Sequence, residues 1–234
     1  MQVMPPAFAA RRVEIEPGRG KDPLPSPLPR RPRIFQRHCI WQDNAATTGL
    51  QIGVMLRLDA NQGWTAKQAV HAIRAMEDAG ILLELVEQPV KGHDLEGLRY
   101  VTERVHTPIM ADESVFGPAQ VIDLIQMRAA DIVNIKLMKT GGISNAIRIA
   151  DIAALHGVEC MIGCMLESSI SVAAAAHVAV AKADTITRVD LDGPSLAQFN
   201  PVDGGVLFNE SEITITDAPG LGIKHIRGLE PLAA

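Results

Sequence analysis

Four charged residues recur along this chain at nearly even spacing, each near the end of a strand-like run of apolar residues. They are Asp59 in MLRLDAN, Glu87 in LLELVEQP, Asp112 in PIMADES and Lys136 in IVNIKLMK, separated by 28, 25 and 24 residues. A strand, its helix and two turns occupy about that length, so successive parallel strands would bring these side chains to one rim. Three carboxylates beside a lysine predict a metal site with a base.

The three carboxylates favour Mg²⁺ over other metals. Each follows residues that belong inside a sheet, where a carboxylate is costly unless it is paired with a cation. Oxygen ligands suit Mg²⁺, a hard ion that tolerates few protein ligands and keeps water in its shell. Zinc is disfavoured, because the seven histidines and three cysteines do not form a four-ligand zinc motif.

Lys136 is the expected base. An inward-facing lysine beside a divalent ion should have a lowered pKa, as a lysine base requires. Lys136 would remove the proton next to a metal-bound substrate carboxylate, and the metal would stabilise the enediolate that develops. Lys139 is the weaker candidate, because a strand residue three positions further along faces the opposite side.

The elements that must position these residues alternate between strand and helix. Strand-like runs begin near residues 54, 81, 107, 131, 158 and 186, with amphipathic segments between them. Thr65 and Ser144 are predicted to cap two of the helices, and Gly80 to end the first. Near-equal units without a dinucleotide fingerprint predict a parallel (β/α) TIM-type barrel. Six units do not close eight strands, so the barrel is expected to be incomplete at its N-terminal side.

The composition divides the chain into three predicted parts. Residues 1–53 are Pro/Arg-rich, with eight of the fifteen prolines in the first 37 residues, and are expected to be irregular. Residues 54–198 carry the barrel pattern. Residues 199–234 form a Gly-rich tail resembling a hairpin, which cannot be another barrel unit.

An ordered series of motifs makes the chain resemble the enolase superfamily, in its muconate-lactonising subgroup. The motifs are LRLDANQGW, VEQP, ADESVF, NIKLMKTGGIS, GVECMIGCMLESS and RVDLDGP, within about residues 54 to 226. Within that subgroup the chain is most similar to the dipeptide epimerases of the L-Ala-D/L-Glu type. The resemblance implies an enolase-like C-terminal barrel domain, an isomerase activity and a dipeptide substrate.

The resemblance also implies roles for individual residues. Asp59, Glu87 and Asp112 would be Mg²⁺ ligands and Lys136 the acid/base on one face of the substrate, consistent with a superfamily that uses lysine or histidine bases with Mg²⁺. Asp190 and Asp192, two apart on an expected strand, would bind the free ammonium of the dipeptide. Asn61 and Glu167 would support the metal ligands.

The chain departs from this family pattern before Asp59. Epimerases of this type take a second acid/base from a Lys-x-Lys pair on the preceding strand, and this chain has no Lys-x-Lys; its only lysine before Asp59 is Lys21. The N-terminal capping domain is also missing from the pattern. A truncated or frame-shifted gene product would explain both departures.

Three functional interpretations therefore remain open. In the first, the chain is a dipeptide epimerase by descent and is active only if another chain supplies the missing part of the site. Alternatively it is a one-base lyase or proton-exchange enzyme, similar to o-succinylbenzoate synthase, or a catalytically dead metal-binding fragment. Two aspartates favour a cationic dipeptide end over an anionic substrate. Metal binding and deprotonation of one face are the stronger expectations.

Composition excludes several other classes of partner. A net charge of -5 with scattered basic residues argues against nucleic acid and anionic membranes. The apolar run at 170–183 is too short to span a bilayer and predicts a buried helix. Two prolines interrupt the N-terminal MQVMPPAFAARR, and three cysteines imply no disulfide framework, so a cytoplasmic protein is expected. Unpaired barrel edges make a homo-oligomer possible.

Overall fold

Six parallel strands form one curled sheet in the computed structural model, which describes residues 33–35, 56–209 and 211–229. The strand order follows the chain, β2-β3-β4-β5-β6-β7. The strands are β2 (Leu56–Asp59), β3 (Leu83–Glu87), β4 (Ile109–Ala111), β5 (Ile132–Lys136), β6 (Glu159–Gly163) and β7 (Ile186–Asp190). This half-barrel confirms the prediction of an incomplete TIM-type barrel, and the strands begin within about two residues of the predicted positions.

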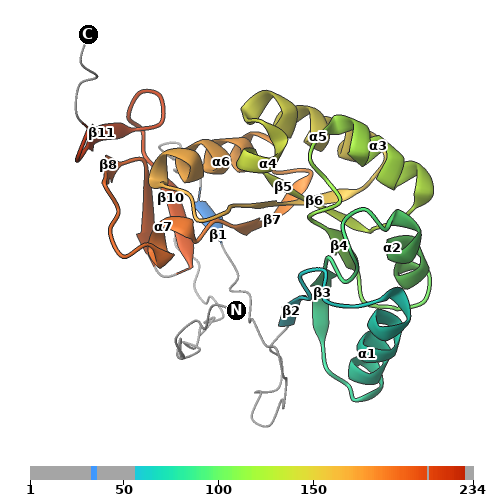
Figure 1. Ribbon diagram of the computed structural model, residues 1–234. Helices are drawn as coiled ribbons and strands as arrows, with labels where there is room; N and C mark the ends of the chain where they lie inside the picture. The colour runs from blue at the N-terminus through green and yellow to red at the C-terminus, as the bar shows by residue number, and fades with distance from the viewer. Residues whose placement is uncertain (1–32, 36–55, 210, 230–234) are drawn as a thin grey trace, which may run out of the picture. The chain divides into compact units, whose positions relative to one another are not determined.

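Helices connect the strands and cover the outer face of the sheet (Figure 1). They are α1 (Ala66–Asp78), α2 (Leu95–Thr102), α3 (Pro118–Met127), α4 (Leu137–Thr140), α5 (Ile143–Leu155), α6 (Ser169–Ala181) and α7 (Gly193–Leu196). Repeated strand–helix units with all strands parallel are the arrangement that the alternating sequence pattern predicts.

Local sequence explains how α1 begins and ends. The Thr65 hydroxyl accepts from the backbone N–H of Gln68, and the Gln68 side chain accepts from the backbone N–H of Thr65, a complete capping box. The helix stops just before Gly80, which takes a φ of 73°. Both predictions for this helix are confirmed.

The predicted cap of α5 is wrong. The helix begins at Ile143, its N-cap is Gly142, and no side chain caps it. Gly141 and Gly142 have φ values of 77° and 107°, which end α4 and redirect the chain at once. Ser144 therefore lies inside the first turn.

The core has two layers because successive strand residues point to opposite faces of the sheet. Between the sheet and its helices, Val86, Val133 and Ile162 are fully buried in the larger apolar cluster. The smaller cluster lies on the inner face and contains Leu85, Met110, Ile132 and Met161. On β5 this alternation places Ile132, Asn134 and Lys136 on the inner face, in successive layers.

The described strands outside the half-barrel are antiparallel. They are β1 (Arg33–Phe35), β8 (Val202–Gly204), β9 (Val206–Asn209), β10 (Glu212–Ile215) and β11 (Ile223–Ile226). One sheet has the order β1-β10-β9, and β8 pairs with β11. All described elements belong to one compact unit, Arg31–Ala234. Apart from β1, the expectation of an irregular segment at 1–53 lies outside the described residues, and the predicted boundaries at 53/54 and 198/199 stay predictions.

Helix α6 confirms the buried helix predicted at 170–183. Its alanine and valine side chains are buried almost all round, including Val172, Ala176 and Ala179. No helix within the described ranges combines the length and the apolar character needed to cross a membrane.

Candidate active site

The carboxyl ends of consecutive strands carry the four residues that the spacing singled out. Asp59, Glu87 and Lys136 are the last residues of β2, β3 and β5, and Asp112 directly follows β4. Parallel strands end at one rim, and Asp59 stands opposite Glu87 in the strand register. The structure therefore has these four residues on one rim of the sheet, as their spacing in the sequence predicted.

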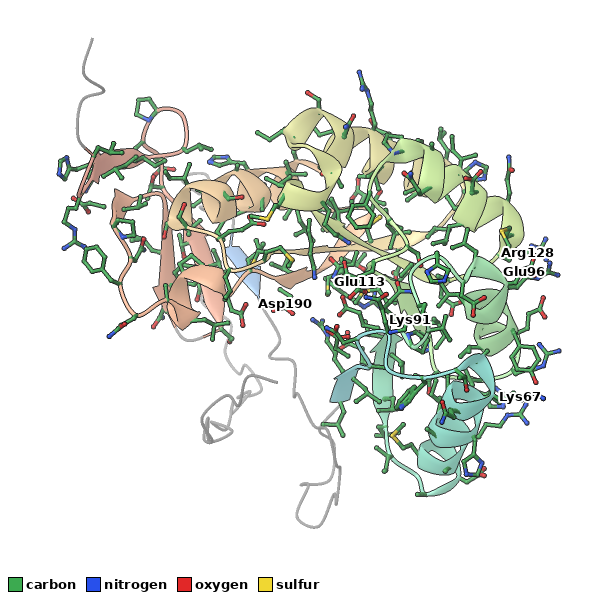
Figure 2. All side chains as sticks on the ribbon, in the orientation of Figure 1. Lys67, Lys91, Glu96, Glu113, Arg128 and Asp190 are labelled. Atoms are coloured by element: carbon green, nitrogen blue, oxygen red, sulfur yellow. The ribbon has the colours of Figure 1, made fainter. Side chains whose placement is uncertain are left out.

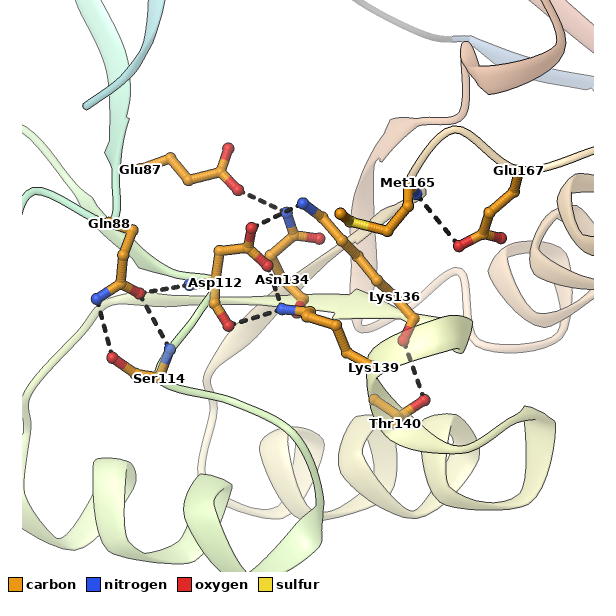
Figure 3. A network of polar contacts seen from close by, with 10 residues as sticks. All are labelled: Glu87, Gln88, Asp112, Ser114, Asn134, Lys136, Lys139, Thr140, Met165 and Glu167. Carbon is orange, nitrogen blue, oxygen red and sulfur yellow. Dashed lines mark hydrogen bonds and ion pairs between the residues drawn. The ribbon is translucent and has the colours of Figure 1, made fainter. Parts of the chain in front are cut away.

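Asp112 lies between two lysines (Figure 3). The Lys136 ammonium is 2.7 Å from Oδ2 of Asp112, and the Lys139 ammonium contacts Oδ1. Lys139 also donates to the backbone oxygen of Asp112 at 2.6 Å. The buried Asp112 carboxylate thus forms ion pairs with two lysine ammonium groups, one through each of its oxygens.

The expectation that Lys139 faces away from the site is wrong. Strand β5 ends at Lys136, and the chain turns directly into α4, which holds Lys139. A helical turn brings residues three apart onto one face, whereas strand alternation separates them. Both lysines consequently reach Asp112 from the same element boundary.

Burial and like charge perturb two of the carboxyl groups. Burial, helped by the charges of Glu113 and Asp112, raises the pKa of Asp59 to about 6. Burial also raises the pKa of Glu87 well above its usual value, and the charges of Asp59 and Asp112 add to this. These interactions show that the three carboxylates lie within electrostatic reach of one another.

The groups around Asp112 shift differently. Burial acts to raise the pKa of Asp112, but Lys139 and Lys136 outweigh it and hold that pKa below its usual value. Burial likewise opposes the charged form of Lys136, yet Asp112, Glu87 and Asp59 raise its pKa, the opposite direction to the fall that a divalent ion would cause. Burial lowers the pKa of Lys139, because its side chain is only 9% exposed and lies beside the Lys136 charge.

The donor set fits a hard cation. The three clustered ligand candidates offer only oxygen, and two of them are carboxyls whose charged forms burial and mutual repulsion disfavour, which a divalent ion would offset. Within the described part of the chain, however, no three Asp, Glu, His or Cys side chains already surround a common point as metal ligands do. Two lysines hold Asp112 instead.

The two residues expected to support the metal ligands make local contacts. Asn61 donates its backbone N–H to Oδ1 of Asp59 at 2.8 Å. Glu167 is buried between β6 and α6, where it accepts from the backbone N–H of Met165 at 3.2 Å and from the Ser171 hydroxyl. Asn61 thus contacts a ligand candidate through its backbone, while these contacts of Glu167 order its own loop.

Asp190 and Asp192 lie at the other side of the half-barrel. Asp190 ends β7 (Figure 2), whereas Asp192 is already the N-cap of α7, with a helical backbone. The premise that both stand on one strand is therefore wrong. Burial raises the pKa of the Cys164 thiol to about 12, and the charges of Asp192, Asp190 and Glu167 contribute. These three carboxylates consequently lie within electrostatic reach of Cys164, the residue that follows β6.

Sequence reasoning missed two buried amides at the rim. Gln88 accepts from the backbone N–H groups of Asp112 and Ser114, at 2.8 and 3.2 Å, and so orders the segment that presents Asp112. Asn134 donates to Oε1 of Glu87 at 2.8 Å. Strand alternation could have found Asn134, because it lies two residues before Lys136 and therefore on the same face.

Comparisons with known proteins agree with this geometry. Residues 44–227 match the family described as Enolase C-terminal domain-like. An L-Ala-D/L-Glu epimerase of Clostridium acetobutylicum is 54% identical over 173 residues, which cover 74% of this chain and 48% of the relative.

Two solved structures are similar over the same part of the chain. A substrate-liganded L-Ala-D/L-Glu epimerase from Bacillus subtilis has a TM-score of 0.71 and 54% identity, covering 73% of this chain and 47% of that one. A dipeptide epimerase from Enterococcus faecalis, complexed with Mg and L-Leu-L-Tyr, has a TM-score of 0.71 and 49% identity, covering 75% and 49%. The chain spans about half the length of the relatives it matches. It belongs to the enolase C-terminal domain-like family.

Proposed function

We propose that this chain supplies the Mg²⁺-binding and proton-transfer face of a dipeptide epimerase, an isomerase acting on amino acid derivatives. The observation that carries the proposal is the group formed by Asp59, Glu87, Asp112 and Lys136 on one rim, in a chain 54% identical over its matched part to an L-Ala-D/L-Glu epimerase. Three oxygen ligands beside a lysine suit proton abstraction next to a carboxylate.

Each of the four rim residues has a proposed role. Asp59, Glu87 and Asp112 would hold Mg²⁺, which when bound supplies positive charge where the substrate carboxylate becomes more negative. Lys136, on the inner face of β5 and 14% exposed, would be the acid/base on one face of the substrate: it would remove the proton of the adjacent carbon from one epimer, and deliver a proton to that face when the other epimer reacts. Its ammonium already lies within hydrogen-bond distance of one ligand candidate, so base and metal would share one edge of the site.

The proposed substrate class is a dipeptide. Asp190 and Asp192 follow the β7 rim, and their carboxylates would suit the free ammonium of such a substrate. The Enterococcus faecalis structure, bound to Mg and a dipeptide, supports the same class.

A second candidate function is proton exchange on one face only. Among the described residues, the lysines that form ion pairs with the proposed metal ligands are Lys136, at the end of β5, and Lys139, in α4, and both pair with Asp112. Epimerisation needs removal and return of the proton on opposite faces, which two lysines from one edge do not provide. This arrangement favours a one-base enzyme.

One experiment separates these functions. Purified protein is incubated with Mg²⁺ and a panel of dipeptides in D₂O, and α-proton exchange and stereochemistry are followed by NMR. Exchange with inversion supports an epimerase, and exchange with retention supports the one-base enzyme. Folded, Mg²⁺-loaded protein that exchanges no proton would contradict both.

Lysine variants assign the base. Lys136→Ala is expected to abolish exchange. Lys182→Ala is the matched control, because Lys182 forms an exposed pair with Asp151 on the outer helices. Exchange that survives in Lys136→Ala would show that another group is the base.

A further inference from the structure

Asn134 connects two strands that are not neighbours. It lies on the inner face of β5, two residues before Lys136, and is 1% exposed. Its Nδ2 donates to Oε1 of Glu87 at 2.8 Å (Figure 3). Glu87 ends β3, and β4 lies between β3 and β5 in the sheet. The amide therefore spans β4 to reach the carboxylate.

The same amide has an unsatisfied oxygen. Oδ1 of Asn134 is buried and has no hydrogen-bond partner within the described part of the chain. A buried polar group without a partner costs free energy, and an apolar side chain of similar size would avoid that cost. The bond to Glu87 is thus the contact that an apolar residue could not provide.

Gly163 leaves the space that this amide occupies. It is the register partner of Lys136 on the next strand. A Cβ at Gly163 would lie 2.8 Å from Oδ1 and 3.2 Å from Nδ2 of Asn134, and 3.1 Å from Cε of Lys136. The φ of Gly163 is not positive, so its backbone conformation does not require glycine. What glycine provides at this position is room for the neighbouring side chains.

We propose that Asn134 and Gly163 act together as a positioning pair for the Glu87 carboxylate. Asn134 holds one oxygen of Glu87, which directs the other toward the rim, and Gly163 keeps Asn134 and the Lys136 stem in place. The proposal rests on the proposed function, in which Glu87 is a Mg²⁺ ligand. Both are positioning residues, because they act through Glu87 and Lys136.

Variants of Asn134 test the hydrogen bond. Asn134→Asp keeps the shape but removes the donor and faces Glu87 with a second carboxylate. Asn134→Leu removes the amide together with its unsatisfied oxygen and adds no charge beside Glu87, so it decides the question if the aspartate variant does not fold. Loss of a group that orients a metal ligand is expected to weaken Mg²⁺ binding about 10- to 100-fold, measured by calorimetry.

Asn200→Asp is the matched control. Asn200 makes a similar amide hydrogen bond, from Nδ2 to the Ser169 hydroxyl at 2.7 Å, and this bond involves neither Glu87 nor Lys136. Thermal melting of each variant without metal reports folding separately from binding. Asn200→Asp should bind Mg²⁺ as the unmodified chain does.

Gly163→Ala tests the second half of the pair. The added methyl group carries no charge or hydrogen-bonding group, yet it should displace the Asn134 amide. Like the Asn134 variants, Gly163→Ala should therefore weaken Mg²⁺ binding. Gly117→Ala is its control, because the nearest atom to a Cβ there is the end of the Gln120 side chain at 3.3 Å. Electron paramagnetic resonance of bound Mn²⁺ should change in both Asn134 and Gly163 variants, since reorienting a ligand alters the metal's coordination.

The outcomes are distinguishable. If folded Asn134→Leu and Gly163→Ala bind Mg²⁺ within about twofold of the unmodified chain, with the same Mn²⁺ spectrum, the positioning role is wrong although the proposed function stands. If the unmodified chain itself binds neither ion, the proposed function and the positioning role both fail.

Discussion

The ammonium of Lys136 lies 2.7 Å from Oδ2 of Asp112, while Lys139 contacts the other oxygen of the same carboxylate. The side chains of Asp112, Lys136 and Lys139 are 6%, 14% and 9% exposed. Little water reaches the three groups, so each charge depends on the others for its stability. The base candidate and a metal-ligand candidate are therefore energetically linked.

Asp112→Asn is expected to be strongly destabilising. The substitution leaves two buried ammonium groups without their shared anion, and removing one partner of a buried pair costs about 3–5 kcal/mol. Lys139→Met keeps the Asp112–Lys136 pair and should cost less. Urea denaturation of the two variants measures the difference, and equal losses would show that Lys136 alone does not satisfy Asp112.

Mg²⁺ is expected to raise the unfolding temperature. Burial and mutual repulsion disfavour the charged forms of Asp59 and Glu87, and a bound cation offsets both effects. A ligand that binds only the folded chain stabilises it by about 2.7 kcal/mol at a hundred times its dissociation constant. Calorimetric melting with Mg²⁺ and then with chelator measures this gain. Asp59→Asn should lose most of it, and an undiminished gain would place the ion elsewhere.

Glu77 should make stability depend on pH in the acid range. Its Oε1 accepts from the backbone N–H of His106 at 2.9 Å, and from the backbone N–H and hydroxyl of Thr107, both at 2.7 Å. Burial opposes the charged form, but these hydrogen bonds prevail and lower the pKa of Glu77 below its usual 4.5. Its stabilisation is therefore present above about pH 4.5 and is lost as the pH falls through the lowered pKa.

Glu77→Ala provides the measurement. The variant should lose about 1–3 kcal/mol of unfolding free energy at neutral pH, and the difference from the unmodified chain should shrink below pH 4. Denaturant titrations at several pH values give both quantities. A difference that stays constant with pH would mean that the lost contacts are packing and not charge.

Glu84 should stabilise the curvature of the open sheet. The arginines of the two edge strands both contact it: Arg57 of β2 at 3.0 Å and Arg188 of β7 at 3.3 Å. Glu84→Gln weakens contacts to two arginines, of which Arg57 is 4% exposed, and is expected to cost about 3 kcal/mol. Asp151→Asn is the control, because it breaks an exposed pair with Lys182 that is worth at most about 1 kcal/mol. Similar losses in urea denaturation would contradict a special role for Glu84.

Features that depend on neighbouring residues were predictable from the sequence. Alternating apolar runs marked the strands, because burial of one face imposes a period of two. Thr65 and Gln68 marked the start of α1, because a cap is completed within four residues. The near-even spacing of Asp59, Glu87, Asp112 and Lys136 predicted a common rim, because equal strand–helix units end on the same side of a parallel sheet.

The sequence by itself determined the parallel half-barrel and the order of its rim residues, since both follow from local periodicity repeated along the chain. Only the tertiary structure decided which side chains meet there. Lys139 contacts Asp112 because β5 ends at Lys136 and α4 begins at the next residue. Asn134 contacts Glu87 across β4, in a space that the absence of a side chain at Gly163 leaves open. Those contacts depend on where an element stops and on the distance between strands far apart in the chain, which no local pattern encodes.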